Sequence, residues 1–110
     1  MSTSSSYQPV ARLDDLPAGA LLAVETASGE RICLANVDGE IVAVSDTCTH
    51  QDFPMSQGTL LPRGVIECAW HGARFDCRTG KVLHMPADEP LPTFHAIVRD
   101  GEILVGARKR

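Results

Sequence analysis

Apolar residues gather in short runs along most of this chain, a pattern that is typical of β-strands. Turn residues separate the runs, and no segment repeats hydrophobic residues at helical spacing. The sequence therefore predicts an all-β fold. The expected strands span residues 10–13, 20–26, 30–37, 40–45, 65–67, 73–76, 93–99 and 102–106.

Two Asp-Gly pairs mark the strongest turns, Asp38-Gly39 and Asp100-Gly101. A two-residue hairpin turn requires left-handed backbone at both positions, which this pair accommodates. Residues 27–29 predict a third hairpin. The strands outside residues 46–92 are therefore expected to form an antiparallel β-sandwich or barrel, and residues 46–92 a smaller lobe between them.

A single domain is expected from the length of 110 residues, which can bury a core. We expect residues 1–6 to be a disordered leader, residues 7–107 to form the domain and residues 108–110 to be a basic tail. The leader lacks the features of a signal peptide, and no apolar run approaches the length that spans a bilayer. We therefore expect no membrane partner and a cytoplasmic protein, whose four cysteines are reduced or metal-bound.

The net charge is −4, from 14 acidic and 10 basic residues. Three of the basic residues stand together at positions 108–110, so the rest of the chain is more acidic still. An acidic surface argues against nucleic acid as a partner. It either favours docking to a basic patch on another protein or serves only to keep the chain in solution.

Two short segments carry residues that bind metals. The first is Cys48-Thr49-His50, and the second, after seventeen residues, is Cys68-Ala69-Trp70-His71. Two thiolates and two imidazoles can complete a tetrahedral zinc site, or a two-iron two-sulfur cluster with histidines on one iron. Zinc sites usually take a cysteine pair and a histidine pair, whereas here each segment supplies one sulfur and one nitrogen. This mixing favours the cluster, with a structural zinc as the alternative.

From about residue 10 to residue 105 the chain resembles a Rieske ferredoxin, most closely the small ferredoxins of bacterial aromatic-ring dioxygenase systems. The resemblance implies a Rieske fold, an antiparallel β-sandwich or barrel base with a small cluster-binding lobe, and one [2Fe-2S] cluster per chain. It assigns Cys48 and Cys68 to one iron. It assigns His50 and His71 to the other iron, through a ring nitrogen, so that electrons enter and leave on the histidine side near the surface.

Other residues near the two segments fit this resemblance. Gly58 and Gly72 permit a tight backbone around the cluster, where N–H groups can donate to its sulfurs, and residues 85–87 correspond to a third shielding loop. Four apolar residues form either an exposed collar that docks to partners or the cover of a local core: Phe53, Pro54, Met55 and Trp70.

Departures from the respiratory Rieske proteins indicate a low reduction potential. The positions that carry a bracing disulfide in those proteins hold Phe53 and Trp70 here. The positions of a serine and a tyrosine that donate hydrogen bonds to sulfur hold Ala73 and Phe75. Each lost donor makes added negative charge on the cluster less favourable, which lowers the potential.

The remaining cysteines and histidines are not expected to be ligands. Cys33 is expected to be a buried thiol in a strand, and Cys77 a bystander thiol near a turn. His84 is expected in a loop near the cluster and His95 in a strand, and neither has a cysteine at ligand spacing.

The resemblance implies a one-electron carrier with no catalytic residue of its own. It would take electrons from an NAD(P)H-dependent flavin reductase and pass them to a terminal Rieske oxygenase in aromatic hydrocarbon catabolism. The alternatives are the small Rieske subunit of an assimilatory nitrite reductase, an isolated Rieske domain of an oxygenase, and a zinc-stabilised interaction module. The sequence shows no 2-His-1-carboxylate segment for mononuclear iron, which counts against the oxygenase domain.

Overall fold

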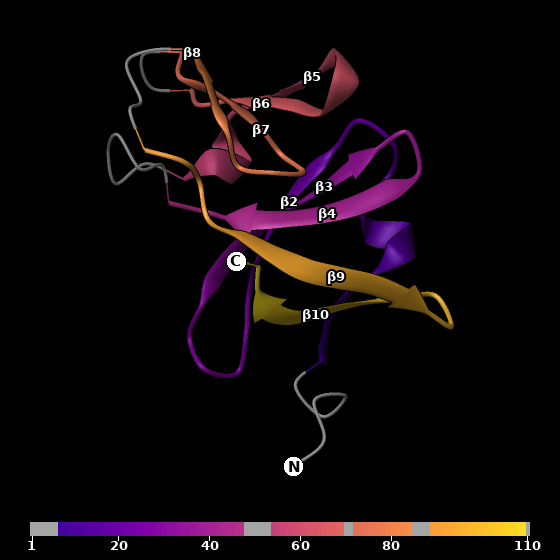
Figure 1. Cartoon of the computed structure of the whole chain (residues 1–110). Coiled ribbons are helices and arrows are strands. Elements are labelled where there is room, and N and C mark those ends of the chain that lie inside the picture. The colour runs from indigo at the N-terminus through magenta and orange to yellow at the C-terminus, as the bar shows by residue number, and fades with distance from the viewer. Residues whose placement is uncertain (1–6, 48–53, 70–71, 85–88, 110) are drawn as a thin grey trace.

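Two antiparallel sheets make up the fold (Figure 1). The computed structural model describes residues 7–47, 54–69, 72–84 and 89–109. In spatial order, the strands of the larger sheet are β1 (Gln8–Arg12), β10 (Glu102–Arg108), β9 (Thr93–Arg99), β4 (Glu40–Ser45), β3 (Arg31–Val37) and β2 (Leu21–Glu25). The Ala27 N–H, just past β2, donates to Gln8 Oε1 on β1 (2.8 Å). The two edges therefore approach each other, and the sheet curls into a nearly closed barrel.

The smaller sheet comes from the centre of the chain and lies against the β3–β4 side of the larger sheet (Figure 1). In spatial order, its strands are β5 (Thr59–Leu61), β6 (Val65–Glu67), β7 (Arg74–Asp76) and β8 (Val82–His84). Three 3₁₀ turns complete the described elements: η2 (Leu13–Asp15), η3 (Met55–Gln57) and η4 (Pro62–Gly64). Among the described residues, no helix is long and apolar enough to cross a membrane.

The two sheets use different parts of the chain. The larger sheet comes from residues outside 46–92 and the smaller sheet from residues within that range. Both Asp-Gly pairs adopt the expected left-handed backbone, with φ of 53° and 99° at Asp38-Gly39 and of 53° and 78° at Asp100-Gly101. The hairpins β3–β4 and β9–β10 therefore form where the sequence predicts them.

Several strand boundaries differ from prediction. β1 ends at Arg12 because Leu13 already belongs to η2, which the Leu16 N–H closes by donating to the Leu13 carbonyl (3.0 Å). β10 runs on to Arg108, and the N–H of Lys109 still donates to the Thr93 carbonyl (2.8 Å). One short strand, β5, was not predicted.

β3 is buried on both faces, which explains its nearly unbroken apolar run. The side chains of Cys33, Ala35 and Val37 belong to the core between the two sheets. Those of Ile32 and Leu34 belong to a second core inside the barrel. Because successive strand residues point to opposite faces, the β3–β4 hairpin is a wall shared by both cores.

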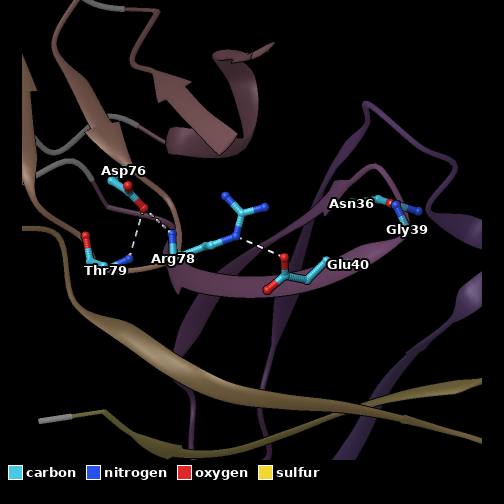
Figure 2. A network of polar contacts seen from close by, with 6 residues as sticks. All are labelled: Asn36, Gly39, Glu40, Asp76, Arg78 and Thr79. Atoms are coloured by element: carbon cyan, nitrogen blue, oxygen red, sulfur yellow. Dashed lines mark hydrogen bonds and ion pairs between the residues drawn. The ribbon is translucent and has the colours of Figure 1, made fainter. Parts of the chain in front are cut away.

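Asn36 fixes the far end of this hairpin and is itself buried (Figure 2). Its Nδ2 donates to the Leu16 carbonyl (2.8 Å), and its Oδ1 accepts from the Gly39 N–H (2.7 Å). The hairpin turn and the segment after η2 are therefore held by one side chain.

An ion pair links the two sheets at the end of the smaller sheet that lies away from Cys68 (Figure 2). Asp76 Oδ1 accepts from the N–H groups of Arg78 (2.8 Å) and Thr79 (3.2 Å) and so shapes the turn after β7. The Arg78 Nε then reaches Glu40 Oε1 (2.9 Å) at the start of β4. Both side chains are exposed, so solvent screens this pair, and burial of the shared core is what holds the sheets together.

Candidate metal centre

One end of the smaller sheet carries the second predicted ligand segment. Cross-strand pairing aligns the ends of all four strands in one row: Thr59, Glu67, Arg74 and His84. Cys68 follows this row directly, one residue past β6. His84, the last described residue before the predicted shielding loop, stands in the same row. The sheet therefore brings the borders of two predicted cluster segments to one end.

Cys68 is buried, with 1% of its surface exposed. Its N–H donates to the Ala73 carbonyl (2.7 Å), which closes the connection between β6 and β7. The other three predicted ligands, Cys48, His50 and His71, lie outside the described residues. The structure thus places a buried cysteine at the end of β6, and the ligand set as a whole stays a prediction.

The described residues on either side of the first predicted ligand segment are held together. Thr47 pairs with Pro54 in an isolated antiparallel bridge. Asp46, one residue earlier, is buried at 3% exposure, and its backbone carbonyl accepts from the Met55 N–H (2.6 Å). The sequence alone gives Asp46 no special role, because it is an acidic residue at the end of a predicted strand. Its burial in the folded structure is what indicates a structural role.

Gly58 and Gly72 are the residues that the backbone around Cys68 requires, as the sequence predicts. A Cβ on Gly58 would collide with the Glu67 carbonyl oxygen, so no larger residue fits between η3 and the end of β6. Gly72 has a φ of 73°, in the left-handed region that favours glycine. The Gly58 N–H, however, donates to the Met55 carbonyl (2.9 Å), so it is engaged within the protein rather than with a cluster sulfur.

Of the two alternatives for the four apolar residues, an exposed collar and the cover of a local core, Met55 fits the second. Met55 is fully buried in the core between the sheets, because its backbone bond to Asp46 draws η3 underneath the smaller sheet. Pro54 is half-buried. Phe53, Trp70 and residues 85–87 lie outside the described residues. On β8, one residue before the end of the strand, Leu83 is instead an exposed apolar side chain (47%).

The described surroundings of Cys68 are apolar and carry no net charge. Ala73 and Phe75 are fully buried in the same core cluster, and neither has a hydroxyl that could donate to sulfur. Glu67 and Arg74, on adjacent strands, form an ion pair (Oε2 to Nε, 2.9 Å) and balance each other. Such surroundings disfavour extra negative charge on a bound cluster.

Within the described part of the chain, no group of three or more His, Cys, Asp or Glu side chains could hold a metal, and the non-ligand role of the remaining cysteines and histidines stays a prediction. His84 lies in β8 rather than in the predicted loop, because it pairs with Arg74. His95 lies in β9, as predicted. Cys33 and Cys77 are buried free thiols of the core between the sheets.

Burial makes both of these thiols poor nucleophiles. Desolvation, followed by the charge of Asp76, raises the pKa of Cys77 to about 11. Desolvation, followed by the charge of Asp46, raises the pKa of Cys33 well above the ordinary value of a thiol. Both side chains are therefore neutral and apolar at physiological pH.

We expect iodoacetamide at pH 8 to label Cys33 and Cys77 in the native holoprotein at least about 100-fold more slowly than a free cysteine. The reason is that the thiolate, whose fraction falls as the pKa rises, is the reacting species. Mass spectrometry of time points measures the rates, and labelling in guanidinium confirms that both thiols are intact. Native labelling of Cys77 at the rate of a free thiol would contradict its burial.

The donor set fits a two-iron two-sulfur cluster. Cys68 is a sulfur donor whose buried position suits a cofactor that is itself shielded on the sulfur side. Cys48 would supply the second thiolate, and His50 and His71 the imidazoles of the other iron. Gly58 packs closely against the Glu67 carbonyl group, and this contact holds the backbone at the end of β6 next to Cys68.

Comparisons with known proteins agree with this centre. Residues 6–95 match the family model of the Rieske [2Fe-2S] domain. The chain is 40% identical over 96 residues to the 3-phenylpropionate/cinnamic acid dioxygenase ferredoxin subunit of Photorhabdus laumondii, which covers 87% of this chain and 90% of that protein.

Solved structures share the fold. A chain in the complex of reduced oxygenase and oxidized ferredoxin in carbazole 1,9a-dioxygenase matches with a TM-score of 0.86 and 31% identity, over 96% of both chains. A putative NADH-dependent nitrite reductase small subunit from Mycobacterium tuberculosis matches with a TM-score of 0.81 over 94% of this chain and 95% of that one, but at 23% identity this likeness shows the fold alone. From its sequence match and its fold, the chain belongs to the Rieske [2Fe-2S] domain family, and its cofactor is one Rieske cluster.

Proposed function

We propose that this protein is the ferredoxin component of an aromatic-ring dioxygenase system. It takes single electrons from an NAD(P)H-dependent flavin reductase and passes them to a terminal Rieske oxygenase. The observation that carries the proposal is the 40% identity, over 87% of the chain, to a dioxygenase ferredoxin subunit. The structural match to a chain from a complex of oxygenase and ferredoxin supports the oxygenase as a partner.

The proposed ligands are Cys48 and Cys68 on one iron and His50 and His71 on the other. The bound cluster supplies one-electron chemistry, and the protein supplies its position and surroundings. Cys68 contributes a buried sulfur, and the apolar residues Ala73 and Phe75 exclude water from that side. A carrier of this kind needs no catalytic acid, base or nucleophile.

We propose residues 7–107 as the working domain, with residues 46–92 as its cluster-binding lobe. The family match over residues 6–95 and the strands from β1 to β10 support these limits. A cytoplasmic location is proposed as well, in keeping with the free thiols of Cys33 and Cys77, since a reducing compartment keeps thiols unpaired.

Reconstitution tests the proposed function. The holoprotein should be reduced by NADH in the presence of a ferredoxin reductase and reoxidised by a terminal Rieske oxygenase with its aromatic substrate, followed by visible absorbance. The alternative, a small subunit of a nitrite reductase, predicts instead a stable complex with the large subunit of that enzyme and no reduction by a ferredoxin reductase. Stable co-purification of that kind would overturn the carrier proposal.

Docking is proposed at the cluster end, and two exposed strand residues form a matched pair to test it. Leu83 on β8 lies beside this end and is 47% exposed, whereas Val98 lies near the β9–β10 turn and is 45% exposed. We expect Leu83→Asp to lower the rate of electron delivery to the oxygenase about tenfold, because a charge in a desolvated contact costs binding energy. Val98→Asp should leave the rate unchanged.

The same expectation holds for Phe53→Asp and Trp70→Asp, which replace the collar residues of the two ligand segments. Stopped-flow reduction of the oxygenase by each pre-reduced variant provides the rates, and iron content confirms that the cluster is present. Equal slowing by Leu83→Asp and Val98→Asp, or no slowing by any of the three variants at the cluster end, would place docking elsewhere.

A further inference from the structure

Asp46 is the one charged side chain that is buried in the described part of the chain. It stands immediately after β4 and makes three hydrogen bonds to backbone groups. Its N–H donates to the Arg31 carbonyl (3.0 Å), and its carbonyl accepts from the Met55 N–H (2.6 Å). Its carboxylate Oδ1 accepts from the Ser56 N–H (2.7 Å). A carboxylate out of water is costly unless it is hydrogen-bonded, so these contacts explain how it is tolerated there.

These bonds join two places in the chain that are ten residues apart. One is the end of β4, and the other is η3, which begins at Met55. Between them lie residues 48–53, which include Cys48 and His50. Thr47 and Pro54 form a bridge just beyond Asp46 and Met55, so both borders of the ligand segment are fixed to the β3–β4 wall.

The Asp46 carboxylate holds η3 at a position that the backbone bonds of Asp46 do not reach. The bridge and the Met55 bond align the two borders, but the Oδ1 bond holds η3 one residue further along, at Ser56. Met55 is thereby kept in the core between the sheets, where it is fully buried. Removing the carboxylate would leave a partly buried Ser56 N–H without this acceptor.

We propose that Asp46 is a positioning residue for the cluster. Its carboxylate holds the returning border of the first ligand segment and so sets the position of Cys48 and His50 relative to Cys68. It acts through hydrogen bonding to the backbone and touches no iron. This inference rests on the proposed ligand set, and it assigns to Asp46 a role that the motif itself does not contain.

Two substitutions separate hydrogen bonding from charge. Asp46→Asn keeps an oxygen that can accept from Ser56 and removes the negative charge, whereas Asp46→Ala removes the acceptor. The probes are the electron paramagnetic resonance spectrum of the dithionite-reduced holoprotein and the rate at which an iron chelator bleaches the oxidised protein. For Asp46→Ala we expect shifted g values and bleaching about tenfold faster than in the unmodified protein, the fold-change that one lost hydrogen bond of this kind gives. Asp46→Asn should restore both to the values of the unmodified protein.

Asn36→Ala is the matched control, because the buried Asn36 side chain likewise bonds to backbone groups, through two hydrogen bonds, but at the far end of the same hairpin. It should lower the unfolding temperature as much as Asp46→Ala does, yet leave the g values and the bleaching rate unchanged. Failure of Asp46→Ala to assemble a cluster, while Asp46→Asn and Asn36→Ala assemble one, would also support the proposal.

Three results would overturn it. Asp46→Ala could match Asn36→Ala in both spectrum and bleaching, which would make Asp46 a general stability residue. Asp46→Asn could be as impaired as Asp46→Ala, which would exclude the acceptor role. Finally, the unmodified protein could lack the spectrum of a cluster with mixed histidine and cysteine ligands, and in that case the ligand set fails first and the role of Asp46 fails with it.

Discussion

Replacing Cys68 with serine will abolish cluster binding. Cys68 is the one proposed ligand among the described residues, a buried sulfur at the end of β6, and serine offers no thiolate there. We expect Cys48→Ser, His50→Ala and His71→Ala to act in the same way, since each removes one proposed ligand. Iron content and visible absorbance should fall to background in all four variants. Each variant should also unfold at a lower temperature, because metal binding contributes to folding.

The matched controls are the two other buried cysteines. Cys33 and Cys77 are as inaccessible as Cys68 and belong to the same core cluster. Cys33→Ser and Cys77→Ser therefore show what the loss of a buried thiol does when that thiol is not a proposed ligand. Both variants should keep two irons per chain, and both should lower the stability of the fold modestly. A cluster that survives Cys68→Ser but is lost in Cys77→Ser would refute the ligand assignment.

The sequence predicts the larger sheet well, because its signals are local. β4 forms at the predicted residues: the Asp38-Gly39 turn determines where the strand begins, and the apolar run over residues 41–44 matches its burial. β3 is equally clear, since burial on both faces makes it nearly continuously apolar. The ligand segments are recognisable for the same reason, as each pairs a cysteine and a histidine within four residues.

Features that depend on contacts between distant residues were not predictable in this way. Met55 looks like an exposed loop residue in the sequence, but its bond to Asp46 carries it into the core. Leu83 gives no signal in the sequence because exposure on an edge strand follows from sheet order. His84 was expected in a loop, and its pairing with Arg74 depends on β7 and β8 meeting.

The role of Asp46 at the candidate site could not be predicted from the sequence either. An acidic residue after a strand is usually solvated, so its sequence position alone predicts nothing. Its significance comes from three bonds that form only when β3, the end of β4 and η3 come together. Motif reading therefore finds the proposed ligands, whereas the residues that position them are found only in the folded structure.

The second large effect concerns the reduction potential. Ala73 and Phe75 are fully buried, they carry no hydroxyl, and they share a core cluster with Cys68. Hydrogen bonds to the sulfurs stabilise the added electron, and their absence lowers the potential. We therefore expect a potential near the low end of the Rieske range, roughly −150 mV rather than +300 mV. Protein-film voltammetry at pH 7 measures it, and a value above zero would contradict the low-potential assignment.

Adding hydroxyl groups at positions 73 and 75 tests whether their absence is the cause of the low reduction potential. Phe75→Tyr and Ala73→Ser each add one hydroxyl, and each should raise the potential by several tens of millivolts, since one hydrogen bond of ordinary strength corresponds to such a shift for a single electron. Phe94→Tyr is the control, because Phe94 is also buried but belongs to the barrel core rather than to the core that contains Cys68. That variant adds the same hydroxyl away from the proposed site and should leave the potential unchanged. An equal rise in Phe75→Tyr and Phe94→Tyr would show that the potential does not respond to a donor at the proposed position, and the hydroxyl explanation would then fail.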